Sequence, residues 1–185
     1  MSSDDLRPFS YVILALVGRG GAGPHDLVRM MRQGRIYWAA AESHYYAEPK
    51  RLAQLGYLKA SREPGRTRER THYRLTERGR GALRDWIGEP AELPRMQHEG
   101  VVKLLAADLA DDETVVRSLT AMRSDIAAAK ARLDVAEQVA GTLEHRERYL
   151  RLVHRLGRGL LEVHERWLDE VEKELSPRSS RRRKA

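Results

Sequence analysis

The stretch SHYYAEPKRLAQLGYL, residues 43–58, has the features of a helix that leads directly into a strand. Ser43 belongs to the residue types that cap helix N-termini, and Gly56 belongs to those that end helices. Pro49 lies between them, although proline in an unadapted helix interior costs about 3 kcal/mol. Two interpretations are open: one helix kinked near Pro49, which we favour, or a shorter helix that begins at Pro49.

Downstream of Gly56 the sequence changes to an alternating pattern, which is typical of β-strands. The segments YLKASRE, residues 57–63, and RTHYRLT, residues 70–76, predict two strands. Pro64 and Gly65 are turn formers between them. We therefore expect a β-hairpin whose tip is rich in arginine.

Helical patterns flank this unit on both sides. Apolar residues recur at helical spacing over residues 6–17 and again over residues 24–34, which begin with Pro24. Thr76 is a suitable N-cap for a further helix over residues 77–87. Three helices, a hairpin and a closing helix predict a winged helix-turn-helix head, and the fold class is mainly α.

The segment GEPAELPR, residues 88–95, contains two prolines and separates this head from a second region. We expect a winged head over residues 1–88, a helical dimerisation domain over residues 89–176 and a basic, disordered tail over residues 177–185.

The helical domain has apolar residues at heptad spacing, which predicts helices that pack along a shared seam. Helices that face only each other within one short chain would form a thin core, so we expect a second copy to bury the seam. The residues assigned to dimerisation are Leu119, Met122, Ile126, Leu133, Leu150, Val153, Leu160, Trp167 and Val171.

The formal net charge of +7 is unevenly distributed. Residues 1–88 carry a net +7, residues 89–176 a net −5 and residues 177–185 a net +5. This asymmetry indicates a head that binds a polyanion. The alternative is a GC-rich genome, which would explain why arginine outnumbers lysine but explains the uneven distribution of charge less well. The chain has no cysteine, no long apolar run and no recognisable leader, so we expect a cytoplasmic protein without disulfides or a membrane span.

One face of residues 43–58 carries groups that hydrogen-bond phosphates and base edges. The candidates there for contact with double-stranded DNA are Ser43, His44, Tyr46, Lys50 and Arg51. In the hairpin, Arg66, Arg68 and Arg70 alternate and so project to one side, where they suit phosphates or a narrow minor groove. The alternatives are a solvated polar face and an edge strand charged against aggregation.

Catalytic chemistry has little support in the sequence. The glycine-rich segment GRGGAG, residues 18–23, lacks the lysine and hydroxyl residue of a phosphate-binding loop, and the histidines form no His-Glu-x-x-His pair. No nucleophile, base and orienting group converge on any segment. We expect no enzymatic activity, no metal site and no cofactor.

Residues 6–88 resemble the PadR family of bacterial transcriptional regulators. The resemblance rests on the order Tyr46, Arg51-Leu52 and Leu55-Gly56, followed by Tyr73-Arg74-Leu75-Thr76 and Gly79. The segment WLDEVEKEL, residues 167–175, is similar to the end of the family's dimerisation domain. Pro49 departs from the family, in which many members have leucine, so base contacts cannot be copied from it.

The resemblance implies a homodimer that binds a promoter inverted repeat, usually as a repressor, and is often released by a small aromatic or drug-like effector. We therefore predict a dimeric, sequence-specific DNA-binding repressor. The alternatives are a protein-interaction adaptor, in which the basic surface is only compositional, and a nonspecific DNA-packaging protein.

Overall fold

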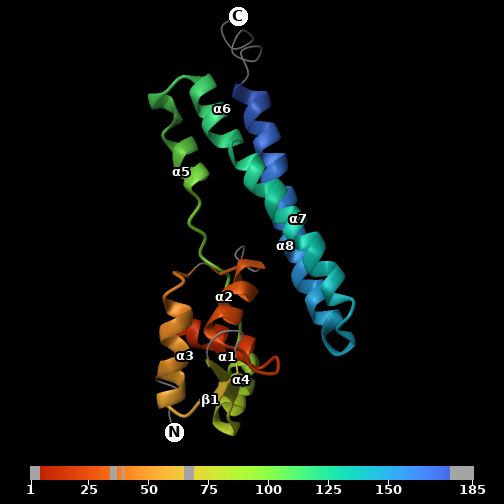
Figure 1. Cartoon of the computed structure of the whole chain (residues 1–185). Helices are drawn as coiled ribbons and strands as arrows, with labels where there is room; N and C mark the ends of the chain where they lie inside the picture. Colours follow the sequence, from red (N-terminus) through yellow and green to blue (C-terminus); the bar gives the residue numbers. More distant parts are fainter. Residues whose placement is uncertain (1–4, 34–36, 39, 65–68, 176–185) are drawn as a thin grey trace, which may run out of the picture. The chain divides into compact units, whose positions relative to one another are not determined.

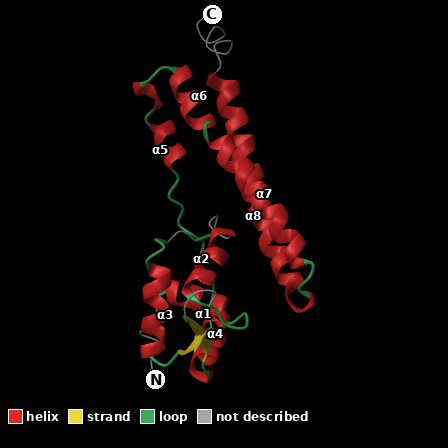
Figure 2. Ribbon diagram, viewed as in Figure 1, coloured by secondary structure: helices red, strands yellow, loops and turns green. Residues whose placement is uncertain are grey.

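The computed structural model describes residues 5–33, 37–38, 40–64 and 69–175. These residues form two compact units that divide between Leu93 and Pro94, within the proline-containing segment expected to separate two domains. Each unit is described by itself. Figure 2 shows that helices dominate both, with a small sheet in the first unit only among the described residues.

The first unit has the winged helix-turn-helix architecture that the sequence predicts. Its elements in chain order are α1 (Pro8–Val17), α2 (Pro24–Gln33), α3 (His44–Gln54), β1 (Leu58–Glu63), β2 (Arg70–Leu75) and α4 (Glu77–Gly88). The strands pair antiparallel, with Leu58 opposite Leu75 and Glu63 opposite Arg70. An isolated bridge between Ala22 and Tyr73 joins the segment before α2 to β2.

Helix α3 contributes one face to the core of this unit. Tyr45, Pro49 and Leu52 are buried at the i, i+4 and i+7 spacing that places residues on one side of a helix. Tyr45 and Leu52 pack in one cluster with Ile13 and Leu14 of α1. The opposite face of α3 is therefore left for solvent or a partner.

Pro49 lies inside α3, which begins at His44 and ends at Gln54. The interpretation in which the helix begins at Pro49 is therefore wrong. Burial of the proline ring against the core offsets part of the cost of the missing backbone hydrogen bond. Gly56 has φ +78°, the left-handed conformation expected of the residue that ends a helix.

Ser43 occupies the N-cap position of α3, but its side chain makes no capping hydrogen bond. Its backbone is already helical, with φ −56° and ψ −33°. A preceding turn supplies acceptors instead, because His44 N–H donates to the carbonyl of Ala41 and Tyr45 N–H to that of Glu42, both at 3.0 Å. The Ser43 hydroxyl is therefore not used to cap the helix.

The second unit is helical throughout its described elements. They are α5 (Glu99–Leu105), the short 3-10 helix η1 (Ala107–Leu109), α6 (Asp112–Thr120), α7 (Met122–Ala140) and α8 (Glu144–Leu175). Figure 1 shows α7 and α8 side by side as a long hairpin. Asp111 caps α6 as expected, with its carboxylate accepting from the Thr114 N–H at 2.8 Å. None of the described helices is long and apolar enough to cross a membrane.

Several residues of the predicted dimer seam are buried within one chain. Leu119, Ile126 and Leu133 form a core with Val171, and Met122 and Trp167 pack against it. Ion pairs flank this contact, including Arg123 with Asp169 at 2.7 Å and Arg158 with Asp134 at 2.8 Å. A heptad pattern shows that a helix has an apolar seam, but it does not say which chain carries the partner helix.

The other predicted dimerisation residues lie on α8 and differ in exposure. Val153 is exposed, whereas Leu150 and Leu160 are half-buried. The exposed apolar side chains of α8 are mostly ones that the sequence did not single out: Tyr149, Leu152, Leu156 and Val163.

Candidate nucleic-acid interface

The outward face of α3 carries most of the DNA-contact residues predicted from the sequence. Ser43, His44, Tyr46 and Lys50 are all exposed. The His44 ring lies 5.9 Å from the Phe9 ring, and the Tyr46 ring meets His25 edge-on at 6.2 Å between centroids. Phe9 and His25 therefore restrict the side chains of His44 and Tyr46. The face as a whole presents hydroxyl, imidazole and ammonium groups.

Arg51 has a different environment from the other four candidates. Its Nε and Nη2 donate to the Glu48 carboxylate at 2.9 and 2.7 Å, and its Nη1 donates to the carbonyl of Asp5 at 2.9 Å. Nη2 also lies 3.0 Å from the Ser10 hydroxyl. These bonds occupy all three guanidinium nitrogens, so Arg51 is a positioning residue of the head rather than a free phosphate contact.

Ser10 and Glu48 complete a partly buried network that fixes α3 against α1. Ser10 is fully buried, donates to Glu48 Oε1 at 2.6 Å and accepts from the Arg7 N–H at 3.0 Å. Burial alone would raise the pKa of the Glu48 carboxyl, but hydrogen bonds from Arg51 and Ser10 and the charge of Arg51 hold that pKa below its ordinary value. The sequence signal for this network was Glu48 three residues before Arg51.

We expect Glu48→Gln to lower the free energy of unfolding of the head by about 1–3 kcal/mol at pH 7, because Arg51 and Ser10 lose a charged acceptor. A carboxyl whose folded pKa is depressed stabilises the fold above its unfolded pKa and loses that contribution as the pH falls through the folded value. The wild type should therefore lose stability on acidification below the ordinary glutamate pKa of 4.5, and the variant should lose less. Urea unfolding from neutral to acidic pH measures both quantities.

Glu77→Gln is the matched control, because Glu77 is an exposed carboxylate whose partner Arg80 lies three residues away at 2.8 Å. Such surface pairs contribute little to stability. Equal destabilisation by the two glutamine variants would contradict the positioning role of the Glu48 network.

The hairpin arginines are only partly described, because Arg66 and Arg68 lie outside the described residues. The Arg70 guanidinium lies 3.8 Å from Asp26 and 3.7 Å from Glu63, which are loose contacts. Arg62 pairs with Glu69 at 3.2 Å. Exposed pairs of this kind contribute little free energy, so a phosphate could replace the carboxylate partners. The carboxylates of Asp26, Glu63 and Glu69 thus offset part of the positive charge of the hairpin.

A hydrogen-bonded junction holds the hairpin against the end of α3. The Thr76 hydroxyl lies 2.7 Å from the carbonyl oxygen of Gly56, to which it donates, and accepts from the Gly79 N–H at 3.1 Å. The Arg78 guanidinium donates to the carbonyl of Leu55 at 2.8 Å. These bonds fix the base of the β1–β2 hairpin relative to the end of α3.

Solved structures share this fold over most of the chain. Bacillus subtilis PadR in complex with operator DNA is 20% identical, covers 90% of this chain and 98% of its own, and has a TM-score of 0.66. The PadR-like transcriptional regulator BC1756 from Bacillus cereus is 16% identical, covers 93% and 100%, and has a TM-score of 0.74. The Vibrio cholerae virulence activator AphA is 23% identical, covers 90% and 96%, and has a TM-score of 0.68.

No protein-family model and no curated protein matches the sequence. The likeness to the solved structures shows that the chain has the fold of PadR-like transcriptional regulators, including helices beyond the winged head. The mainly α fold class and the winged head predicted from the sequence are therefore confirmed.

Proposed function

We propose that this chain is a PadR-family transcriptional regulator that binds promoter DNA as a homodimer. The observation that carries the proposal is the outward face of α3, which exposes Ser43, His44, Tyr46 and Lys50 while the opposite face is buried in the head. In helix-turn-helix proteins the second helix of the motif enters the major groove. The solved relative from Bacillus subtilis was crystallised with operator DNA, which supports the same use of this fold here.

Each group on α3 has a role that follows from its chemistry. The Lys50 ammonium suits a phosphate, and the Ser43 hydroxyl suits a phosphate near the start of the helix. His44 and Tyr46 carry donors and acceptors that can reach base edges in the major groove. Arg70, with Arg66 and Arg68 from the hairpin, suits the flanking backbone or minor groove, whereas Arg51 holds α3 in place.

We further propose that the chain represses transcription and is released from DNA by a small-molecule effector. Repression rests on the family resemblance, and a relative of the same fold is an activator, so the direction of regulation is tested separately by a reporter assay. A structure of Bacillus subtilis PadR was solved with p-coumaric acid, which supports a small-molecule effector for this chain as well. We assign no catalytic step to the chain, because the solved proteins that share its fold are transcriptional regulators.

The surface proposed for dimerisation is an outward apolar stripe of α8, made of Tyr149, Leu152, Leu156 and Val163. Each of these side chains is more than half exposed. Their spacing of three, four and seven residues places them on one side of the helix. A contiguous apolar face on one long helix is typical of a subunit interface. A second copy presenting the same stripe would cover it and would hold two heads at a fixed spacing.

Lys50→Ala is expected to weaken binding to the promoter upstream of the chain's own gene and to random DNA by similar factors. Binding weakens because the variant loses one phosphate contact. The same loss reduces the slope of log affinity against log salt concentration by about 1. Titration of both DNAs at several salt concentrations gives affinity and slope together. Lys173→Ala, an exposed lysine in the last turn of α8, is the control and should leave both unchanged.

The same titration separates the alternative functions. A specific regulator binds its promoter about a thousandfold or more tighter than random DNA. Equal binding to both, with strong salt dependence, would instead support a packaging protein. Binding to neither would support the protein-interaction adaptor.

A further inference from the structure

His72 is a buried histidine of β2, and neither of its ring nitrogens has a hydrogen-bond partner. Its Nε2 lies directly against Gly21 in the glycine-rich turn before α2, where an added Cβ atom would collide with it. Its Nδ1 lies 3.5 Å from Oε2 of Glu63 on β1. A histidine so close to a carboxylate forms an ion pair only when its ring is protonated.

The Glu63 carboxylate is shared by three basic side chains of β2. Arg74 Nη2 donates to its Oε1 at 3.3 Å, and the Arg70 guanidinium lies 3.7 Å from its Oε2. Arg70, His72 and Arg74 alternate along the strand, so they project from one face of the hairpin. All three contacts are longer than a charge-assisted hydrogen bond, for which about 2.7–2.9 Å is usual. The three basic groups therefore compete for one carboxylate, and we call these four residues the Glu63 cluster.

Three further charged residues belong to the elements around this cluster. Asp26 of α2 lies 3.8 Å from Arg70, and its Oδ2 also accepts from the Gly23 N–H at 3.2 Å. Lys59 of β1 projects from the same face of the hairpin as the cluster, and Arg19 belongs to the turn that covers the histidine. Within the described part of the chain, no carboxylate other than that of Glu63 lies within 4 Å of the imidazole ring.

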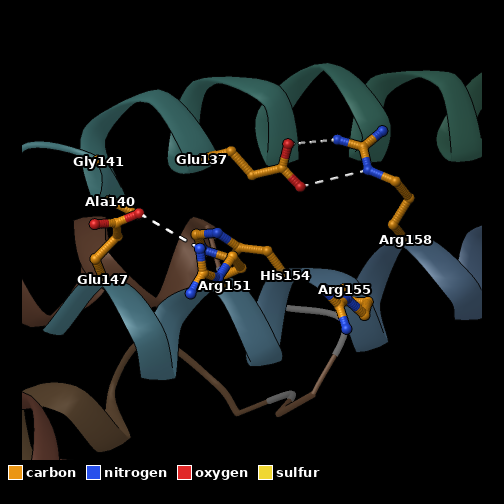
Figure 3. Close-up of a pocket in the computed structure, with 8 residues that line it drawn as sticks. All are labelled: Glu137, Ala140, Gly141, Glu147, Arg151, His154, Arg155 and Arg158. Atoms are coloured by element: carbon orange, nitrogen blue, oxygen red, sulfur yellow. Dashed lines mark hydrogen bonds and ion pairs between the residues drawn. The ribbon is translucent and has the colours of Figure 1, made fainter.

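His154 of α8 also has a buried ring nitrogen without a partner. It lines a hollow between α7 and α8, where Figure 3 shows Glu137 bound to Arg158. That pair is tight, at 2.8 Å, and no described carboxylate lies within 4 Å of the His154 ring. Protonation of His154 would leave a charge without a partner, whereas protonation of His72 would give Glu63 one.

We propose that His72 and Glu63 are positioning residues for the hairpin arginines, and that the pair takes up a proton from solvent when the protein binds DNA. This inference rests on the proposed DNA-binding function. When phosphates engage Arg70 and Arg74, the Glu63 carboxylate loses both arginine partners, and its charge then favours protonation of His72. The imidazolium in turn holds Glu63, so the two guanidinium groups stay available to DNA. Because proton binding and DNA binding are linked, DNA affinity rises as the pH falls.

Promoter titrations at about pH 7.5 and about pH 5.5, a range in which histidines change charge, test the proposal. Calorimetry in buffers of different ionisation enthalpy counts the protons taken up on binding. We expect the wild type to gain about fivefold more affinity on acidification than His72→Gln, because one charge is added in each of two heads. The wild type should also take up more protons. His25 and His44 are present in both proteins, so the difference between them reports His72.

Glu63→Gln is a second variant, which keeps the test decisive if His72→Gln does not fold, because the Glu63 side chain is only half-buried. Glutamine imitates a carboxylate whose charge has been neutralised. This variant should therefore bind the promoter more tightly than the wild type at neutral pH, should gain less affinity on acidification and should take up fewer protons. A merely structural role of the pair would instead weaken binding without changing the proton uptake.

His154→Gln and Glu69→Gln are the matched controls. The first removes a buried histidine that has no carboxylate beside it, and the second removes a hairpin carboxylate that pairs with Arg62 at 3.2 Å. Both should keep the proton uptake of the wild type, and circular dichroism verifies that each variant folds. Promoter binding with the same proton uptake in the wild type, His72→Gln and Glu63→Gln would overturn this proposal and leave the DNA-binding function standing. Binding to neither promoter nor random DNA at either pH would overturn both.

Discussion

Glutamate at both Leu152 and Leu156 is expected to turn the proposed dimer into a monomer and to weaken promoter binding by about a hundredfold or more. Both side chains are exposed in the isolated chain, at 60% and 59% of their surface. Burial of a leucine stabilises an interface by about 1.5–3 kcal/mol, and a two-fold interface contains each residue twice. Two buried carboxylates per subunit would reverse that contribution, because an unpaired charge cannot be buried at low cost.

The effect on DNA binding follows from the geometry of two linked heads. A dimer presents two recognition helices to two half-sites, and the second contact is made at a high effective concentration once the first has formed. A monomer loses this advantage and retains only the contacts of one head. Sedimentation equilibrium measures the change in mass, and promoter titration at fixed salt measures the change in affinity.

The control is Leu152→Met with Leu156→Met, since methionine preserves apolar character and approximate volume. This variant should remain a dimer and should bind the promoter as the wild type does. Helix content should be kept in both variants, because the two side chains lie outside the buried core of the chain. A glutamate variant with the wild-type mass would show that dimerisation uses another surface.

The fold of the head was predictable because local signals agreed. The residue types at Ser43, Gly56 and Thr76 place boundaries within a residue or two of those observed, and the change from helical to alternating periodicity marks the hairpin. The sequence leaves two interpretations of Pro49 open, because helix propensity gives only the cost of a proline inside a helix and not whether tertiary packing offsets that cost. Burial of its ring beside Tyr45 and Leu52, a tertiary effect, determines that the helix continues through it.

The candidate sites were less predictable, for a physical reason that differs between residues. Arg51 looks like a DNA contact in the sequence, but its partners Ser10 and Asp5 are distant in the chain and become visible only in the folded head. Leu133 of α7 and Leu152 of α8 are both apolar helical residues, and their different roles depend on which faces of the two helices meet. Sequence periodicity identifies faces, whereas pairing of faces is a property of the tertiary structure.

Alanine at Gly79 is expected to destabilise the head by about 3 kcal/mol, although alanine is otherwise favoured over glycine in helices. Gly79 lies in the first turn of α4 and is buried. A Cβ atom there would approach the carbonyl oxygen of Tyr57 more closely than real Cβ atoms do, and would lie 3.2 Å from Leu75 Cδ2. The Tyr57 oxygen already accepts the Thr76 N–H at 3.1 Å, so a shift of this carbonyl would disturb the base of the wing.

Gly81→Ala gives the matched comparison, because Gly81 lies two residues further along α4 and its Cβ would meet nothing within 4 Å. That substitution should stabilise the head by about 0.5–1 kcal/mol through helix propensity alone. Native-state hydrogen exchange of the β1 and β2 amides reports the stability of the head separately from that of the second unit. The two variants are expected to change the stability of the head in opposite directions, because only Gly79 lies against a backbone carbonyl. A stabilising effect at both positions would mean that α4 does not approach Tyr57 closely, and the fixed placement of the wing beside α3 would then lack its support.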